Sequence, residues 1–332
     1  METLFPSKSQ STTNKLTPHR IDVHHHILPP EYVSALAGIG ITDAAGVPFP
    51  NWSPQNSLNV MDRNGIATAI TSISSPGVYF GDSAFSRNLA RRCNDFSAGL
   101  VKEYPKRFGA FTVLPLPDVK GALREIDYAL DELKLDGIVL LTNYAGHYLG
   151  TPEFDDLFYE LNRRKAVVYV HPAAPPAENL PKLRLPAALI EFPFDTTRAI
   201  ANLIYSGTFE RCPDIRFIFS HAGGTAPYLA WRISLFENVP GMQAKAPQGV
   251  ITYLKRLYYD TALSATPYAL RSLQELVDLS HIIFGSDYPF APESVTSATV
   301  SGLKQYAGFD EKALKTIERD NALRLFTRLS KG

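Results

Sequence analysis

The chain has 332 residues, of which 45% are hydrophobic, and its basic and acidic side chains balance to a formal net charge of zero. This balance, without a long charge run, disfavours nucleic-acid and polybasic membrane partners, and the two cysteines are too few for a disulfide framework or a cysteine zinc site. No apolar segment approaches the ~18 residues that span a bilayer, and residues 1–18 lack the apolar core of a signal peptide, so we expect a cytoplasmic protein.

Short apolar runs typical of buried strands recur along the chain. In order they cover residues 21–26, 67–73, 108–114, 137–141, 166–170, 215–220, 257–261 and 282–285. Helical patterns cover residues 31–37, 87–104, 119–133, 153–164, 195–209, 226–237 and 267–279, and most of the chain after residue 297, where Asp310 or its neighbour is a plausible helix cap. Residues 38–56 and the proline-rich residues 171–193 are predicted to be long loops.

Eight strands that alternate with helices predict parallel β/α units, and eight such units match a closed (β/α)8 TIM barrel. Residues 217–219 and 282–284 are continuously apolar, as in strands buried on both faces. The alternative is an open doubly wound sheet, but no Gly-x-Gly-x-x-Gly turn follows the first strand. We therefore predict a flexible tail over residues 1–18 and a single barrel domain over residues 19–332.

Four histidines and an aspartate stand at the ends of predicted strands. His24 and His26 lie two residues apart on the first strand, so their side chains point to the same side. His171 ends the fifth strand, His221 ends the sixth, and Asp287 follows the eighth. Because active sites of barrels lie at the carboxyl ends of the strands, we expect these five side chains to meet.

His24, His26, His171 and Asp287 make a nitrogen-rich set with one negative charge. Such a set suits a divalent metal, with zinc favoured and manganese or iron(II) as alternatives, and it leaves a position open for water or substrate. Each residue alone has a plain explanation, such as a strand end, a helix cap or a turn. Their coincidence at several strand ends favours a metal site.

Four motifs resemble those of the amidohydrolase superfamily. They are Ile-Asp-Val-His-His-His at residues 21–26, Val-His-Pro at 170–172, Ser-His-Ala-Gly-Gly at 220–224 and Gly-Ser-Asp-Tyr-Pro-Phe at 285–290. Within the superfamily they are similar to the branch that includes aminocarboxymuconate semialdehyde, γ-resorcylate and 6-methylsalicylate decarboxylases. The similarity covers roughly residues 20–328. It implies the four metal ligands above and an unligated acid or base at His221.

The resemblance also implies a homodimer or homotetramer. Arg232 matches an arginine that some relatives send across the subunit interface toward a substrate carboxylate, and an ordinary surface arginine is the alternative. Binuclear relatives carry a carboxylated lysine after strand four, where this chain has no lysine, so we expect one metal ion. Residues 38–56 contain no arginine or lysine, which argues against a substrate with two carboxylates.

Aromatic side chains near strand ends are candidate walls for an aromatic ring. They are Trp52, Tyr79, Phe80 and Phe290, and a place in the core is the alternative for each. The resemblance thus implies a carboxy-lyase that removes CO2 from a small aromatic carboxylic acid, a hydroxybenzoate similar to 6-methylsalicylate. Either Asp287 or His221 would deliver the proton. A hydrolase of a lactone or amide is the alternative, since the same metal would activate water, and a binding protein without turnover is a third hypothesis.

Overall fold

The computed structural model describes residues 18–176 and 183–331, so the predicted tail lies outside the described residues except for Pro18. Its central feature is one sheet of eight parallel strands in the order β1-β4-β5-β6-β9-β10-β11-β12. The strands are β1 (Arg20–His26), β4 (Ile66–Ser72), β5 (Phe108–Val113), β6 (Gly137–Leu141), β9 (Val167–His171), β10 (Arg216–Phe219), β11 (Tyr258–Asp260) and β12 (Ile282–Ile283).

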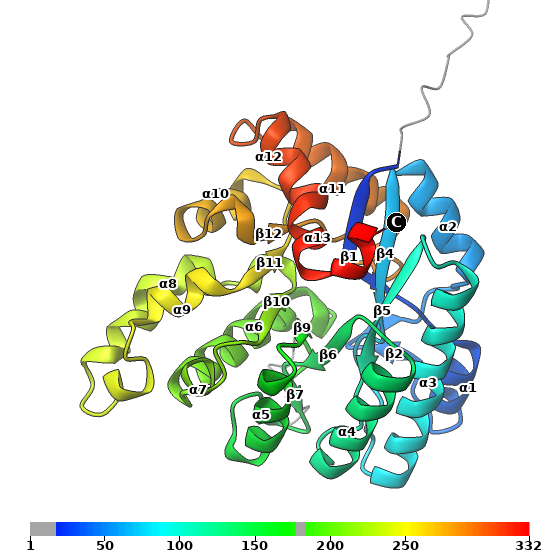
Figure 1. The fold of residues 1–332 in the computed structure, drawn as a ribbon, viewed down its shortest axis with the longest axis horizontal. Helices are drawn as coiled ribbons and strands as arrows, with labels where there is room; N and C mark the ends of the chain where they lie inside the picture. Colours follow the sequence, from blue (N-terminus) through cyan, green and yellow to red (C-terminus); the bar gives the residue numbers. More distant parts are fainter. Residues whose placement is uncertain (1–17, 177–182, 332) are drawn as a thin grey trace, which may run out of the picture.

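The last strand returns to the first. His25 forms a parallel bridge with Tyr288, just after β12, and the Val23 amide donates to the Phe284 carbonyl at 3.0 Å. These contacts close the sheet, and Figure 1 shows the helices arranged around it. The predicted (β/α)8 barrel is confirmed.

Helices follow most strands and cover the outside of the sheet (Figure 1). They are α1 (Pro30–Ala37), α2 (Pro54–Arg63), α3 (Ser83–Glu103), α4 (Val119–Ile126), α5 (Asp155–Arg163), α6 (Ala187–Tyr205), α7 (Thr208–Arg211), α8 (Ala226–Ser234), α9 (Val250–Arg256), α10 (Pro267–Leu276), α11 (Glu293–Gln305), α12 (Glu311–Lys315) and α13 (Asn321–Leu325). Asp310 caps α12, because its side chain accepts from the Ala313 amide. In the described part of the chain, no helix is long and apolar enough to cross a membrane.

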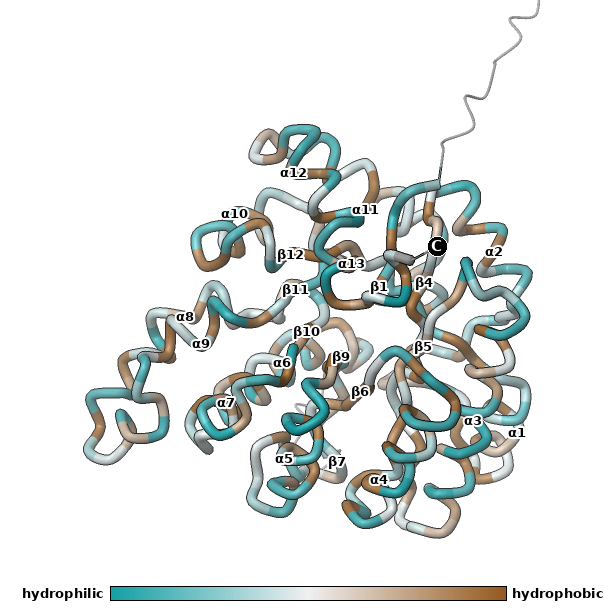
Figure 2. Tube along the Cα trace, viewed as in Figure 1, coloured by the Kyte–Doolittle hydropathy of each residue, from teal (hydrophilic) through white to brown (hydrophobic). Residues whose placement is uncertain are grey.

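The core lies inside the sheet and between the sheet and its helices. Figure 2 shows hydrophobic segments along the central strands, while hydrophilic segments predominate on the outer turns. Phe217 and Phe219 of β10 are almost fully buried, and the rings of Phe111 and Tyr169 stack inside the barrel with centroids 5.2 Å apart. Strands covered on both faces have near-continuous apolar runs, as at residues 217–219 of β10, and this explains why the sequence pattern located that strand.

The amino-terminal end of the barrel is closed by the C-terminal helices. Arg20 at the start of β1 is fully buried, and its Nε donates to Glu318 Oε1 at 2.8 Å. Arg328 donates to Asp136, just before β6, through Nε and Nη2, both at 2.9 Å. These ion pairs therefore cover the starts of β1 and β6 with the C-terminal segment.

Two predicted loops contain regular structure. Residues 38–56 include the hairpin of β2 (Asp43–Ala44) and β3 (Val47–Pro48), and α2 begins within them at Pro54. The second loop was predicted to reach residue 193, but α6 begins at Ala187 and contains Pro193 in its interior. The proline-rich pattern predicts a loop up to this residue, yet the helix tolerates the backbone donor that Pro193 lacks, and the Pro193 carbonyl accepts from Thr197 Oγ1 at 2.8 Å. Residues 177–182 of this predicted loop lie outside the described residues. Helix α9 was not predicted from the sequence.

Candidate metal and substrate site

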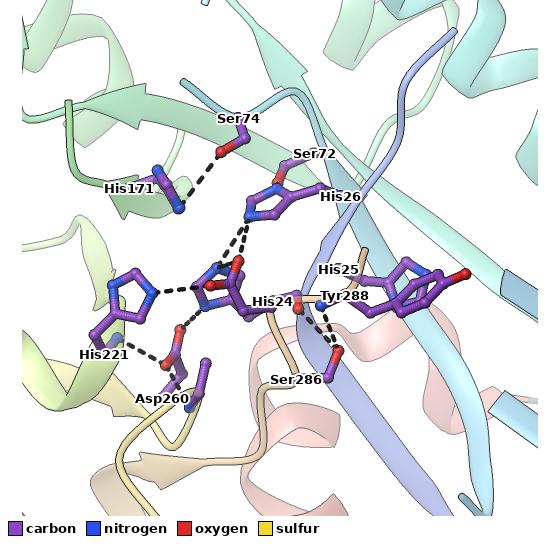
Figure 3. A network of polar contacts seen from close by, with 12 residues as sticks. His24, His25, His26, Ser72, Ser74, His171, His221, Asp260, Ser286 and Tyr288 are labelled. Carbon is purple, nitrogen blue, oxygen red and sulfur yellow. Dashed lines mark hydrogen bonds and ion pairs between the residues drawn. The ribbon is translucent and has the colours of Figure 1, made fainter. Parts of the chain in front are cut away.

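The predicted metal ligands and His221 meet at the carboxyl end of the barrel (Figure 3). His24 Nε2 lies 3.0 Å from His26 Nε2 and 3.0 Å from Asp287 Oδ1. His26 Nε2 lies 3.1 Å from the same carboxylate oxygen. The rings of His171 and His26 approach with centroids 4.8 Å apart. Segments separated by more than 260 residues thus bring their ligand atoms to one buried point.

Three of the histidines are fixed in the same way. The Nδ1 atom of His24 lies 2.8 Å from Asp260 Oδ2, that of His26 lies 2.9 Å from Ser72 Oγ, and that of His171 lies 2.9 Å from the Pro172 carbonyl. Each ring is therefore held through Nδ1, and its Nε2 faces the centre of the site. Metal-binding histidines are oriented in this manner by partners behind them. Three convergent nitrogens and one carboxylate oxygen fit a divalent cation.

His221 is held differently. Its Nε2 lies 3.3 Å from Asp287 Oδ2, and its Nδ1 is buried without a hydrogen-bond partner among the described residues. Its backbone has a positive φ of 53°, and Asp287 has a φ of 63°. Positive φ angles are uncommon outside glycine, and residues held in such conformations concentrate at functional sites. The Asp260 carboxylate accepts from the His221 amide at 2.9 Å, which helps to hold this backbone in place.

A second grouping of the same cluster has to be considered. Ligand atoms from His24, His171, His221 and Asp287 all lie within 4.8 Å of one another, and this group has His221 in place of His26. The five residues together offer more ligand atoms than one tetrahedral ion needs. The contacts of Nδ1 favour the grouping with His26 over the one with His221, since His221 lacks the contact that fixes the other three imidazoles.

The charges in the site favour the protonated, positively charged form of His24. Burial lowers the pKa of His24, but the carboxylates of Asp260 and Asp287 more than offset this and raise the pKa to about 10. Burial also acts against ionised Asp287, and the neighbouring histidines nevertheless hold its pKa well below the usual value. The protonated imidazole thus supplies the positive charge that the two buried carboxylates require.

The other two convergent imidazoles are neutral. Burial, together with the positive charge of His24, lowers the pKa of His26 to about 4. Burial and the neighbouring His26 and His24 lower the pKa of His171 well below its ordinary value. Neutral imidazoles have lone pairs available to bind a cation. On His24, a cation must first displace the proton on Nε2.

A cavity of about 630 Å³ opens from these residues. Phe290, one of the predicted aromatic walls, lines it, and its ring centroid lies 5.7 Å from that of His26. Phe192, which the sequence analysis did not single out, also lines it and lies 5.7 Å from His171. No lysine or arginine occurs among the described residues of the lining. The cavity therefore suits an aromatic ring whose single carboxylate lies at the metal-binding end.

The other three aromatic candidates lie elsewhere. Trp52 is buried in the core, where its Nε1 donates to Ser57 Oγ at 2.8 Å. Tyr79 and Phe80 line two other cavities, and the ring of Phe80 packs against that of Phe85. Proximity to a strand end in sequence predicted these walls, but the loops carry the three side chains away from the cavity.

Arg232 lies on α8 and is exposed to solvent. It does not line the cavity within this chain. Two large apolar side chains on the same helix are also exposed, Tyr228 by 82% and Trp231 by 72%. Arg232 could therefore contact a substrate only in the cavity of a second subunit that packs against this surface.

Several residues that shape the site were not predicted. Asp260 ends β11 and contacts both His24 and His221, and the Tyr169 hydroxyl donates to it at 3.1 Å. Asp22 accepts from the Ser286 amide at 3.0 Å and from its hydroxyl at 2.6 Å, and so connects β1 with the segment that carries Asp287. The sequence signal for Asp260 is its position near the end of the predicted seventh strand, where side chains of a barrel active site are expected.

The chain is similar to known proteins over most of its length. A sequence model of the family described as Amidohydrolase matches residues 21–328. The curated relative Decarboxylase yanB from Aspergillus niger is 40% identical over 326 residues, which cover 93% of this chain and 88% of the relative. The 6-methylsalicylic acid decarboxylase from Penicillium expansum is 34% identical over 315 residues, which cover 93% of this chain and 97% of the relative.

Solved structures show the same fold. A structure named amidohydrolase II superposes with a TM-score of 0.87 at 34% identity and covers 93% of this chain and 99% of its own. The 5-carboxyvanillate decarboxylase from Novosphingobium aromaticivorans, solved with manganese and a nitrobenzoic acid, has a TM-score of 0.84 at 22% identity and covers 94% of this chain and 97% of its own. At that identity the second comparison supports the fold alone.

Proposed function

Since the chain belongs to the amidohydrolase family, we propose that it is a metal-dependent carboxy-lyase that removes CO2 from a hydroxybenzoate without oxidation. The proposed substrate resembles 6-methylsalicylate, and the products are the corresponding phenol and CO2. The activity of the 6-methylsalicylic acid decarboxylase from Penicillium expansum supports this choice. The observation that carries the proposal is the convergence of three anchored imidazoles and one carboxylate at the end of an apolar cavity.

We assign His24, His26, His171 and Asp287 as the ligands of one divalent ion. The contacts that hold Nδ1 of each imidazole support this set over the one that includes His221. When bound, the ion would supply positive charge that attracts the carboxylate and the neighbouring hydroxyl of the substrate and stabilises negative charge on the ring oxygen. The three nitrogens favour zinc, and manganese is the alternative, as in the related 5-carboxyvanillate decarboxylase.

The remaining side chains would orient the ring and move a proton. Phe290 and Phe192 stand beside the ligands and offer faces and edges against which an aromatic ring packs. In the reaction, the bond between the ring carbon and the carboxylate breaks, CO2 leaves, and a proton becomes attached to that carbon. Asp287 and His221 contact each other at 3.3 Å, so either one can deliver this proton, which remains on the product, and a proton from solvent replaces it on the pair.

The assembly is also part of the proposal. We propose a homodimer or homotetramer in which Arg232 reaches the partner's cavity, and the exposed Tyr228 and Trp231 beside it on α8 support a contact there. A cytoplasmic location remains a prediction from the sequence. Sedimentation of the purified protein measures the assembly, and Arg232→Ala should raise KM for an aromatic acid if the arginine crosses the interface.

The decisive experiment is metal analysis followed by an assay of CO2 release. We expect one divalent ion per chain, loss of CO2 release after chelation, and recovery when zinc or manganese is added. His24→Ala should lose both metal and activity, whereas His221→Ala should keep the metal and lose activity. Release of CO2 by stripped protein would refute the proposal. Formation of a ring-opened acid from a lactone, without CO2, would favour the hydrolase instead.

A further inference from the structure

The cavity is larger than the substrate proposed above. A methylsalicylate has about eleven non-hydrogen atoms, so it needs no more than about 330 Å³ even if each atom takes the volume of a water molecule in the liquid. The cavity has about 630 Å³. Roughly half of the space therefore lies beyond a ring that is seated at the metal ligands.

The additional space is apolar. The polar side chains of the whole cavity lining are Ser74, His171, His221, Ser264 and Asp287. All of these except Ser264 lie at the inner end, around the metal ligands. The rest of the lining consists of small and aliphatic side chains with two phenylalanines. The described residues of this part are Ala44, Val47, Pro186, Ala188, Leu189, Phe192, Pro193, Gly224, Leu263, Phe290, Ala291, Pro292 and Val295.

Three separate elements form this apolar compartment. The β2–β3 hairpin contributes Ala44 and Val47, the start of α6 contributes Ala188 and Leu189, and the first turn of α11 contributes Val295. None of these residues is adjacent to a metal ligand in the sequence. The compartment is thus a feature of the assembled fold.

The hairpin and α6 are packed directly on each other. The Ala188 amide donates to the Ala45 carbonyl at 3.2 Å. A Cβ at Gly46 would lie 3.2 Å from Cα of Pro186, so the two backbones are in close contact. This part of the wall therefore exists before a ligand enters, as in most small-molecule sites.

We propose that the enzyme takes salicylates whose ring carries an extended apolar substituent, such as an alkyl chain of several carbons in place of the 6-methyl group. This inference rests on the proposed function, because the carboxylate and hydroxyl end of the substrate must lie at the metal ligands. The substituent would then lie against the apolar lining of the compartment. A charged substituent would be buried there without a cation among the described residues to pair with it, which is unfavourable.

The gain from each buried methylene sets the size of the expected effect. Burial of one methylene corresponds to about a threefold to fourfold change in an equilibrium or rate ratio. We therefore expect kcat/KM to rise from 6-methylsalicylate through 6-propylsalicylate to 6-pentylsalicylate, by about threefold for each added carbon. A 6-carboxylate should lower kcat/KM at least tenfold relative to 6-methylsalicylate.

The test measures CO2 release by the metal-loaded protein over this series, with wild type and two variants that fill the compartment. Val47→Phe and Val295→Phe should lower the ratio of kcat/KM for the pentyl substrate to that for the methyl substrate at least tenfold. Val239→Phe is the matched control, because Val239 is exposed and does not line the cavity. It should leave the ratio unchanged.

The outcomes separate this inference from the proposed function. If 6-methylsalicylate is decarboxylated and the longer substrates are worse, the extended compartment is refuted and the proposed function stands. If no member of the series releases CO2, the proposed function fails. Calorimetric binding of 3-methylphenol and 3-pentylphenol gives a readout without turnover. Tighter binding of the pentylphenol, weakened by Val295→Phe, supports the compartment, and equal binding overturns it.

Discussion

The carboxylate of Asp260 lies 2.8 Å from Nδ1 of His24 and is fully buried with it. The same carboxylate accepts from the amides of His221 and Ala262 at 2.9 and 3.0 Å. One side chain at the end of β11 therefore fixes a ligand from β1 and the backbone of the candidate acid or base after β10. A carboxylate behind a ligating histidine sets its tautomer and makes it more basic.

Asp260→Asn is expected to weaken metal binding about tenfold to hundredfold, because an amide keeps the shape but removes the charge behind His24. Competition with a chromophoric chelator measures the dissociation constant. Asp278→Asn is the control, since Asp278 caps a helical turn away from the site. Unchanged affinity in Asp260→Asn, with normal thermal unfolding, would mean that the carboxylate does not support the ligand.

The barrel and the five converging side chains were predictable for the same physical reason. Strands buried on both faces have continuous apolar runs, and parallel strands place their carboxyl ends together. A reactive residue at the end of such a run, as at His171 or Asp287, is then placed by topology alone. The observed bounds of β6 agree with the predicted residues 137–141.

The parts that were not predictable depend on contacts between distant segments. The position of Asp260 at the end of a predicted strand marks it as a candidate site residue, but its role depends on the contact with Nδ1 of His24, which the sequence does not reveal. Trp52, predicted as a pocket wall, instead packs against Phe96 in the core, because the course of a long loop is set by its tertiary contacts. The start of α6 was hidden by Pro193, whose effect on a helix depends on what surrounds it.

Metal binding is expected to release about one proton at neutral pH. The pKa of His24 is about 10, so below that pH the metal-free site holds a proton on the imidazole that a cation must displace. The apparent affinity should therefore rise about tenfold for each pH unit as the pH increases toward 10. His26, with a pKa of about 4, adds nothing above pH 6.

Chelator-buffered titrations with manganese between pH 6 and 9 measure this dependence. Asp260→Asn removes one of the charges that raise the pKa of His24, so its affinity should depend less steeply on pH. An affinity of the wild type that does not change across this range would contradict the protonated state of His24.

Asp195 of α6 is expected to stabilise the segment after His171. It is fully buried and accepts from Asn143 Nδ2 at 2.8 Å and from the hydroxyls of Thr142 and Tyr148. Thr142 Oγ1 in turn accepts from the Ala173 amide at 2.9 Å. Asp195→Asn replaces one acceptor with a donor that faces other donors, which should lower the free energy of unfolding by about 1–3 kcal/mol.

Urea denaturation measures this loss, and Asp156→Asn on the exposed face of α5 is the control. The Asp195 variant should also show a raised KM for an aromatic acid, since α6 carries Phe192 into the cavity. Equal stability of the two variants would show that the buried contacts around Asp195 contribute no net stability.

Gly224 is the point where the turn after His221 meets α6. A Cβ at this position would lie 2.1 Å from the Pro193 carbonyl oxygen, and the φ of +64° is itself unfavourable for other residues. Gly224→Ala must therefore displace either the turn or the helix, and both line the cavity.

Gly249→Ala separates steric contact from backbone strain, because Gly249 has a φ of +84° but no atom within 4 Å of the added carbon. Backbone strain alone costs about 1–3 kcal/mol in both variants. We expect the Gly224 variant to lose several times more stability in thermal unfolding and most of its CO2 release, and equal effects in the two variants would show that the contact with Pro193 does not fix the turn.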